Sequence, residues 1–569
     1  MREGMDIDKI FPGWPERKKR ILRRLQAMEN ERSSWDSHCR DIAGHFMPRR
    51  SRFLNAGEQT NDGDPRNYLE TGIGIKKLNN LAAIMQSGIT SPSREWFSLT
   101  VQDSNLSRLQ SVKEWTDVLQ EQMFGVFQRS NFYDQIHLLY KELAAFGTSV
   151  MLLESDDDFT IRCRTLTFGE YCLDVNASGR VNTLYRRVRM TPDQIVEAWP
   201  DTAPDEIRRL SERDAISWQT VIHAIEPNPD YREENLQAKY RKFSSVYLME
   251  NGDPLEVGGY HEFPALCPRW DTTASDIYGS SPCMDALNDN RQLQLITEDG
   301  RTALELNVKP PLAVSGIQSL LDISPGAINP VNSLAQGNIG IQPIFETNVN
   351  FAALSKEKED IKNDISEMLF NDLLLLISGR SPNMTATQAD IMNNEKLLLL
   401  GPVLDRLRSE LFQPLIERVY GIMDRQGMIP KPPEELIGQE IKIEFISILA
   451  QGQKQAGKGG IVETVMFAGQ LAGLTRDQGV MDKINLDAAV EEIANINGVP
   501  AILLRSDEDI QGLREQRQRQ MQMAQGMAMA GQGAEIAATG ARAAKDAGLT
   551  PDMLAAAAGG QGGADVSVQ

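Results

Sequence analysis

Apolar residues recur at helical spacing in the N-terminal quarter of the chain. Ile21, Leu22, Leu25 and Met28 fall on one face of a helix predicted over 14–46. The same spacing predicts three further helices, over 69–87, 112–128 and 133–146. Gly147 directly follows the last of these and is typical of a helix end. This part of the chain is therefore predicted to be helical.

After Thr148 the hydrophobic period changes from the helical one to the period of two that is typical of strands. Turn sequences, among them Asp156-Asp157-Asp158, separate the short runs, so we expect a β meander. Thr191 and Thr202 each precede a proline and predict two helix starts with a hydroxyl cap. The predicted strands cover 149–154, 160–165, 170–175, 181–188, 220–226 and 245–250.

The helical pattern returns at Ser281, where Leu293, Ile296, Gly300 and Leu304 share one face of a helix. Lys309 and the two prolines after it end this helix. A second helix, predicted over 352–377, should pack antiparallel to the first. The stretch 310–346 between them is rich in glycine, proline and asparagine and holds two predicted strands, 312–315 and 339–345. It is predicted to be a small exposed subdomain.

The longest helical signal covers 387–425, where apolar residues from Val403 to Val419 recur every four positions. Pro402 and Pro414 should bend this helix rather than end it. A last strand is predicted over 440–447, followed by a linker, a helical block to 505 and a low-complexity tail over 521–569. The predicted fold class is α+β and mostly helical.

Composition and charge limit the possible functions. The 569 residues, 41% hydrophobic and 24% charged, suit about three or four globular units. The formal net charge of -20 argues against tight DNA binding but would let a duplex slide past without sticking. We expect no secretory signal and no membrane span, hence synthesis in the cytoplasm. The five scattered cysteines predict buried thiols and no disulfides.

Several residue groups resemble chemical sites, but none predicts an enzyme. The string from Gly452 to Gly459 matches a phosphate-binding loop except that Gly459 stands where a magnesium-binding hydroxyl is needed. His38 and His45 share a helix face without further metal ligands nearby. The basic run over 17–24 predicts a solvated helix face, with a polyanion contact as the alternative. No catalytic, cofactor or metal site is therefore predicted.

Three sequence strings carry a resemblance to a known family. They are Gly379-Arg-Ser-Pro-Asn-Met-Thr-Ala-Thr387, Leu399-Leu-Gly-Pro-Val-Leu-Asp-Arg-Leu407 and Glu410-Leu-Phe-Gln-Pro-Leu-Ile-Glu-Arg418, and Ala145-Phe-Gly-Thr-Ser149 supports them. Together with the order of elements, they resemble the portal proteins of tailed phages, above all the podovirus head-to-tail connecting proteins. The likeness covers most of the chain up to about residue 450. Gln388 departs from it, because such sequences often carry an acidic residue there.

The resemblance implies a structural subunit of a dodecameric ring at one capsid vertex in the virion. Double-stranded DNA would pass through its channel during packaging and ejection. Implied partners are the terminase large subunit, a head-tail adaptor or tail proteins, and the major capsid and scaffolding proteins. The implied parts are a wing (1–280 with 427–454), stem helices (281–308 and 352–378), a clip (309–351), a tunnel loop (379–386), a long kinked wing helix (387–426), a crown (455–506) and a barrel helix with its tail (507–569).

The resemblance also implies two sets of site residues. The tunnel loop nearest DNA would comprise Gly379, Arg380, Ser381, Pro382, Asn383, Met384, Thr385 and Ala386. The clip, which would dock terminase and adaptor, would use Pro310, Pro311, Gly316, Pro325, Asn329, Pro330, Gly337 and Gly340. Arg380 suits either a phosphate contact or a salt bridge at a helix end. A nucleotide hydrolase and an internal scaffold protein remain the alternative functions.

Overall fold

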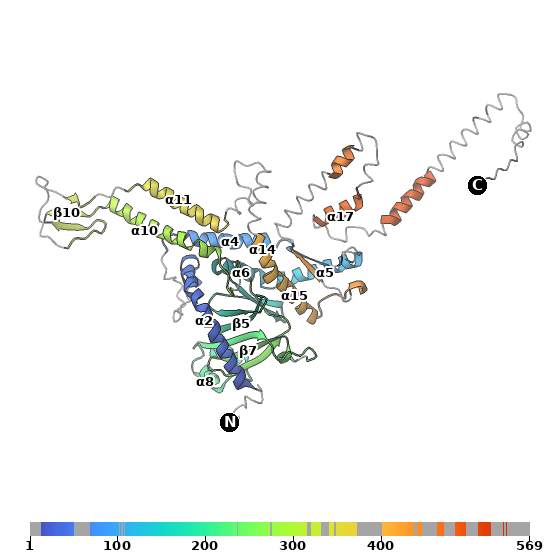
Figure 1. Ribbon diagram of the computed structural model, residues 1–569, viewed down its shortest axis with the longest axis horizontal. Coiled ribbons are helices and arrows are strands. Elements are labelled where there is room, and N and C mark those ends of the chain that lie inside the picture. Colours follow the sequence, from blue (N-terminus) through green and yellow to red (C-terminus); the bar gives the residue numbers. More distant parts are fainter. Residues whose placement is uncertain are drawn as a thin grey trace, which may run out of the picture. The chain divides into compact units, whose positions relative to one another are not determined.

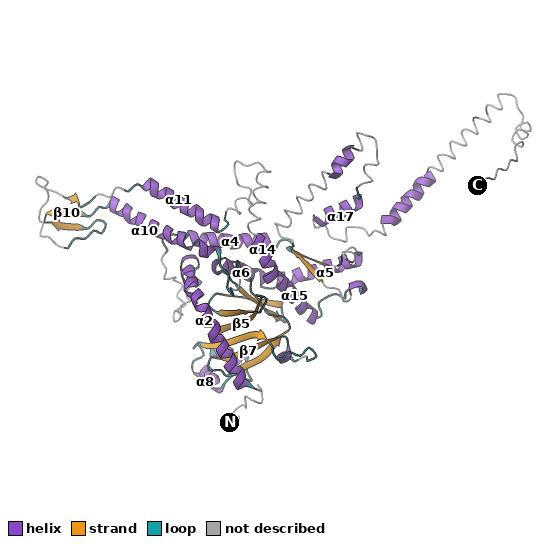
Figure 2. Cartoon of the chain, viewed as in Figure 1, coloured by secondary structure: helices purple, strands orange, loops and turns teal. Residues whose placement is uncertain are grey.

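The computed structural model describes most of the chain up to residue 371 and shorter stretches beyond it. Two compact units, Met1–Ile484 and Asn485–Gln569, are treated separately. Figure 2 shows the mixture of helices and strands that was expected. The described residues are 13–50, 69–101, 103, 106, 109–235, 237–273, 276–315, 320–331, 341–345, 349–371, 401–436, 441–445, 464–471, 484–496, 510–524, 539 and 542.

The four N-terminal helices are confirmed. They are α2 (Trp14–Phe46), α4 (Ile73–Ile89), α5 (Gln110–Arg129) and α6 (Phe132–Phe146), with a short 3-10 turn η1 (Pro48–Arg50) after α2. Gly147 ends α6 in the left-handed conformation with φ 72°. Leu78 of α4, Leu119 of α5 and Leu139 of α6 are buried in the main hydrophobic core. The predicted apolar face of α2 is buried in a second cluster through Ile21, Leu25 and Met28. The helical period in the sequence therefore marks the buried faces correctly.

The expected meander divides into two sheets. The first joins β2 (Val150–Asp156) to β3 (Thr160–Leu166) and to β9 (Ala265–Leu266). Its hairpin turn is capped by the Asp156 carboxylate, which accepts hydrogen bonds from the backbone N–H groups of Asp158 and Phe159 at 3.0 Å. The aspartate cluster is therefore a solvated turn, as predicted.

The second sheet is a five-stranded antiparallel meander. Its strands follow one another in sequence: β4 (Tyr171–Val175), β5 (Val181–Met190), β6 (Gln219–Pro227), β7 (Phe243–Met249) and β8 (Pro254–Tyr260), with the 3-10 turn η3 (Ala238–Tyr240) before β7. Strand β8 was missed, because its glycines and proline weaken the strand signal.

Two short helices, α7 (Pro192–Ala198) and α8 (Asp205–Arg213), connect β5 to β6. The predicted cap at Thr191 is confirmed as a capping box with Gln194. The predicted cap at Thr202 is wrong. The Thr202 hydroxyl donates instead to the Leu255 carbonyl, and Pro204 stands at the N-cap without a side-chain hydrogen bond. The contact with β8 therefore replaces the local cap.

The basic run in α2 holds that helix against the meander. Arg20 and Arg24 both pair with Glu226 of β6, and Arg24 also pairs with Asp174 of β4 at 2.7 Å. Arg17 donates to the Ser244 hydroxyl. Lys19, Arg20 and Arg23 are exposed. The prediction of a solvated face is therefore wrong for Arg17 and Arg24, because acidic and polar groups of the sheet lie opposite them.

The long helix near residue 410 continues through Pro414. It comprises α14 (Gly401–Leu407), a π-helical turn η4 (Arg408–Phe412) and α15 (Gln413–Arg425). Proline lacks the N–H that would bond the carbonyl four residues earlier, and the wider π turn lies where that bond would fall. Beyond the helix, the 3-10 turn η5 (Glu434–Leu436) precedes β13 (Ile441–Phe445).

Strand β13 pairs antiparallel with β1 (Phe97–Val101), so that Phe97 is opposite Phe445. The predicted strand over 440–447 is confirmed, whereas β1 was missed. The string from Gly452 to Gly459 lies outside the described residues. A helical stretch over 464–471 is the next described part.

The second unit contains α17 (Leu486–Ile496) and a helical stretch over 510–524. Arg514 forms a bidentate pair with Asp487, with distances of 2.6 and 2.8 Å. This pair joins the two helices within the unit.

All five cysteines are free and buried. Burial raises the pKa of each thiol above its usual value, so the thiols stay protonated at neutral pH. They therefore pack as small apolar groups, as predicted.

Candidate interaction surface

Two helices that contact each other, α10 (Leu287–Val308) and α11 (Phe351–Met368), carry a small sheet beyond their ends (Figure 1). The short helix α9 (Pro282–Asp285) leads into α10, and the Ser281 hydroxyl caps it by accepting from the Met284 N–H. A Cβ placed on Gly300 would lie 2.8 Å from Leu354 Cδ2. The two helices therefore come close together at Gly300.

One end of the helix pair is anchored in the main core through Leu287 and Leu293 of α10 and Ile361 and Ile365 of α11. Beyond Leu293, α10 exposes large apolar side chains. Leu295 is 61% exposed, Leu304 52% and Val308 70%. At about 100° per residue, Leu295 lies on the opposite side of the helix from Leu304 and Val308, so α10 has apolar side chains facing solvent on two sides. Exposed apolar side chains of this size usually mark a surface that a partner covers.

Helix α11 ends at Met368, so the predicted helix end at 377 is wrong. Residues 372–400 lie outside the described part of the chain. Phe370 takes a left-handed φ of 52°, a conformation that glycine usually supplies at this point. The Phe370 N–H donates to the Glu367 carbonyl and the Asn371 N–H to the Ser366 carbonyl. These bonds, and the contact of Phe370 with Trp270, hold the turn that stops the helix.

The small sheet has the strand order β11-β10-β12. Strand β10 (Leu312–Ser315) pairs parallel with β11 (Ile328–Val331) and antiparallel with β12 (Gln342–Pro343). The strand predicted over 312–315 is confirmed as β10. Of the strand predicted over 339–345, residues 341–345 are described, and β12 covers two of them. Strand β11 was not predicted because Pro330 argues against a strand in the sequence. Proline is tolerated in strands mainly at a sheet edge, and β11 is an edge strand of this sheet.

Five of the predicted docking residues build this sheet and its turns. Pro310 and Pro311 lead from α10 into β10, and the Pro311 carbonyl accepts from the Ile344 N–H at 2.8 Å. Pro325 and Gly326 occupy the centre of a turn in which Gly326 has φ 76° and the Ala327 N–H bonds the Ser324 carbonyl. Pro330 lies in β11.

Asn329, the fifth of these residues, is only 2% exposed and clamps a neighbouring loop. Its amide Nδ2 donates to the Asp322 carbonyl and its Oδ1 accepts from the Asp322 N–H, both at 2.6 Å. Hydrogen bonds from the Ser324 hydroxyl and N–H lower the pKa of Asp322. The clamped loop presents Leu320, Leu321 and Ile323 to solvent, and Leu320 is 96% exposed.

The other predicted site residues belong to parts of the chain outside the described residues. Gly316, Gly337 and Gly340 lie outside the described residues, as does the whole loop from Gly379 to Ala386, including Arg380. The exposed aliphatic residues at 320–323 were not predicted as site residues. An apolar run next to proline and glycine is the only signal that could have indicated them.

Within the described residues, no group of His, Cys, Asp or Glu side chains is arranged to hold a metal ion. In that same part of the chain, no helix combines the length and apolar character needed to cross a bilayer. The exposed aliphatic side chains of α10 and of residues 320–323 make the surface built by α10, α11 and the small sheet suited to contacts with other macromolecules.

Comparison with known proteins gives consistent matches along the chain. A model of the bacteriophage head to tail connecting protein family matches residues 18–504. A probable portal protein of Bordetella phage BPP-1 is 36% identical over 92% of this chain and 95% of its own length. The portal protein of Salmonella phage epsilon15 is 35% identical with the same coverage. The portal protein of Escherichia phage T7 is 22% identical over 94% of this chain and 95% of its own.

Proposed function

Because the chain belongs to the bacteriophage head to tail connecting protein family and is a portal protein of the capsid vertex, we propose that twelve copies close into a ring. The channel of this ring conducts the double-stranded DNA genome during packaging and ejection. The protein acts as a structural component of the virion and needs no catalytic residue or cofactor for this role.

The parts of the chain take different roles in the proposed ring. The two sheets with α2 to α8 and the helix 401–425 form the wing, and α10 with α11 forms the stem. The small sheet is the clip, which docks the terminase large subunit during packaging and the head-tail adaptor afterwards. Residues 379–386 form the tunnel loop, residues 455–506 the crown and residues 507–569 the barrel, on the capsid side near the scaffolding and major capsid proteins.

The exposed apolar side chains of α10 are the observation that carries this proposal. Burying a leucine or valine contributes about 2 kcal/mol, so leaving Leu295, Leu304 and Val308 in water is costly for an isolated chain. A head-to-tail contact between identical subunits covers such a surface on every copy when the ring closes. The core-anchored ends of α10 and α11 hold the apolar surface in a fixed orientation for that contact.

The acidic character of the chain supports the channel role. With a net charge of -20, the subunits repel the DNA phosphates and leave few strong binding sites at which a moving duplex would stall. Glu298, Asp299 and Glu305 of α10 are exposed and contribute to this repulsion.

The proposal is tested by the mass and symmetry of the purified full-length protein. Mass photometry should give twelve times the 63.4-kDa chain, and negative-stain images should show closed rings with a central channel. The double variant L304D/V308D should shift the protein toward monomers, because charged side chains are costly to bury. Ile216→Asp serves as the matched control, since Ile216 is equally apolar and 78% exposed but lies before β6. Rings that form equally well in both variants would refute the stem interface.

A further inference from the structure

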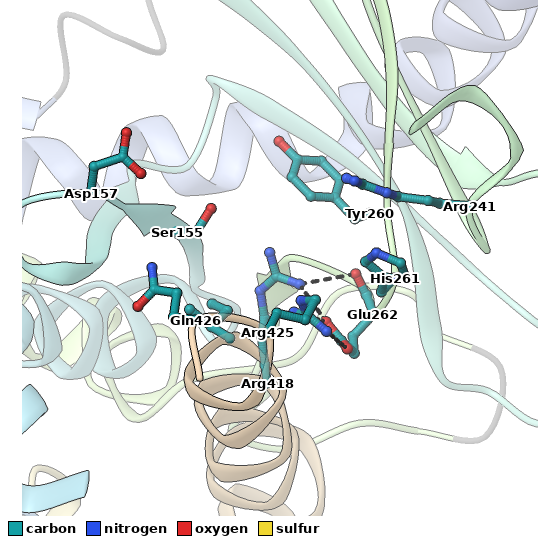
Figure 3. A pocket seen from close by; sticks show the side chains of 10 residues that line it. Ser155, Asp157, Arg241, Tyr260, His261, Glu262, Arg418, Arg425 and Gln426 are labelled. Atoms are coloured by element: carbon teal, nitrogen blue, oxygen red, sulfur yellow. Dashed lines mark hydrogen bonds and ion pairs between the residues drawn. The ribbon is translucent and has the colours of Figure 1, made fainter. Parts of the chain in front are cut away.

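A cavity of about 280 Å³ lies where the end of β8 meets α15 and the β2–β3 hairpin (Figure 3). Three arginines line it: Arg241 before β7, and Arg418 and Arg425 of α15. Such a concentration of cationic side chains is unexpected in a chain whose net charge is -20. Portal function, as proposed above, assigns no role to this cavity.

Glu262 is the carboxylate that these arginines share. Arg425 binds both of its oxygens, at 2.7 and 3.0 Å, and Arg418 binds one of them at 3.3 Å. Arg418 is only 4% exposed, and its Nε donates to the Leu153 carbonyl at 2.7 Å. Burial lowers the pKa of Arg418 to about 10, so the guanidinium remains charged at neutral pH. Two cations therefore depend on one carboxylate.

Arg241 adds a third cation with an unused donor. Its Nη1 donates to the Gly259 carbonyl at 3.0 Å, but its buried Nε has no hydrogen-bond partner among the described residues. Burial lowers the pKa of His261 in the same wall, and the charges of Arg241 and Arg425 lower it further, against the opposing effect of Glu262. The cavity wall therefore carries more positive than negative charge and has an unused donor in Arg241 Nε, although Asp157 lines another part of it.

We propose that this cavity binds a small oxyanion of the phosphate class, held by Arg241 and Arg425 beside Glu262. Planar guanidinium groups donate in pairs to the oxygens of such anions. The volume has room for the anion and several waters, at about 30 Å³ for each water. The cations converge on one hollow rather than along a line, and this arrangement suits a small anion better than the extended backbone of DNA.

The first test measures the melting temperature of the full-length protein in sodium phosphate and in sodium chloride of equal ionic strength. At about 50 mM, phosphate should raise the melting temperature by at least about 2 °C more than chloride does. Arg241→Gln should abolish this difference, whereas the control Arg232→Gln, at an exposed arginine outside the cavity, should retain it. The proposal fails if wild type shows no difference, or if Arg241→Gln retains it.

Anion rescue provides the second test. Glu262→Gln removes the shared carboxylate and should lower the melting temperature, and phosphate should restore part of the loss by taking its place between the arginines. Glu410→Gln breaks a different pair, with Arg269, and Glu410 does not line the cavity. Phosphate should not rescue that variant more than chloride does. Equal rescue of both variants would reveal a general salt effect and overturn the proposal.

A third measurement distinguishes free phosphate from phosphate in DNA. A short DNA duplex, supplied at the same phosphate concentration, should produce no Arg241-dependent rise in melting temperature. If duplex DNA stabilises wild type but not Arg241→Gln, and inorganic phosphate has no effect, the small-anion proposal is wrong.

Discussion

Arg269 donates hydrogen bonds to both carboxylate oxygens of Glu410, with Nε 3.1 Å from Oε1 and the backbone N–H 2.9 Å from Oε2. Both side chains are largely buried. Arg269 belongs to the segment that leads into α9, and Glu410 lies in the π-helical turn of the long helix. The pair therefore ties the entrance of the α10–α11 helix pair to the helix that follows it in the chain.

Replacing Glu410 by glutamine should destabilise the protein by about 3 kcal/mol, because it leaves the Arg269 guanidinium buried without its counter-charge. Arg406→Gln is the control, since its ion pair with Asp271 at 3.4 Å is more exposed and should contribute less than about 1 kcal/mol. Urea unfolding followed by tryptophan fluorescence measures both. Equal losses would show that the burial of the Arg269–Glu410 pair is unimportant.

Gly147→Ala should destabilise the protein by more than about 2 kcal/mol. Gly147 has φ 72°, and a Cβ there would lie 2.2 Å from the Gly279 carbonyl oxygen. Gly125→Ala in α5 is the matched control, because no atom lies within 4 Å of its Cβ position. That change should stabilise the helix by about 0.5 to 1 kcal/mol. The melting temperature should therefore fall in Gly147→Ala and rise in Gly125→Ala.

The stability of the protein should fall in mild acid through His223. Its ring is fully buried between Arg186 and Ser245, and burial, followed by the charge of Arg186, lowers its pKa well below 6.5. The unfolded chain thus binds a proton below pH 6.5 that the folded chain excludes. The stability present above that pH is lost as the pH falls, by at most about 1.4 kcal/mol per unit.

His223→Gln should make the free energy of unfolding less dependent on pH between about pH 7.5 and about pH 5.5. The comparison with wild type is needed because Glu142 has the opposite effect on stability. Burial raises the pKa of Glu142 to about 6, so protonation of this carboxyl in acid stabilises the folded protein. Both proteins contain Glu142, so the difference between their pH profiles reports His223 alone. Identical pH profiles of the two proteins would contradict the assignment.

Asn290→Leu in α10 should leave stability unchanged or raise it by about 1 kcal/mol. Asn290 is fully buried against Gly74, and neither of its amide atoms has a hydrogen-bond partner among the described residues. Leucine has nearly the same shape without polar atoms that need a partner. A clear loss in melting temperature would mean that Asn290 makes a hydrogen bond in the assembled protein.

Replacing residues 310–346 by a short Gly-Ser linker should leave rings that assemble but do not dock the terminase or the adaptor. The α10–α11 pair should persist, since Leu293 and Ile365 anchor it in the core. Negative-stain imaging tests assembly, and a DNA packaging assay with purified terminase tests docking. Normal packaging by this variant would refute the role proposed for the small sheet.

Local chemistry in the sequence determined most of the elements. Gly147 ends α6, Asp156 caps a hairpin turn and Thr191 caps α7, as the residues at those positions predict. Such features depend on neighbours within about four residues, so they can be deduced without knowledge of the fold. The motifs from Gly379 to Arg418 were sufficient to indicate the family.

Tertiary structure decided which distant groups meet. Arg24 carries the same charge as the exposed Arg23, yet it pairs with the buried Glu226, about two hundred residues away. The motif residues Glu410 and Arg418 likewise acquire their partners, Arg269 and Glu262, only through folding. A charged side chain is compatible locally with solvent or with any opposite charge. The packing of sheet and helix selects one partner, because burying the charge unpaired would cost several kcal/mol.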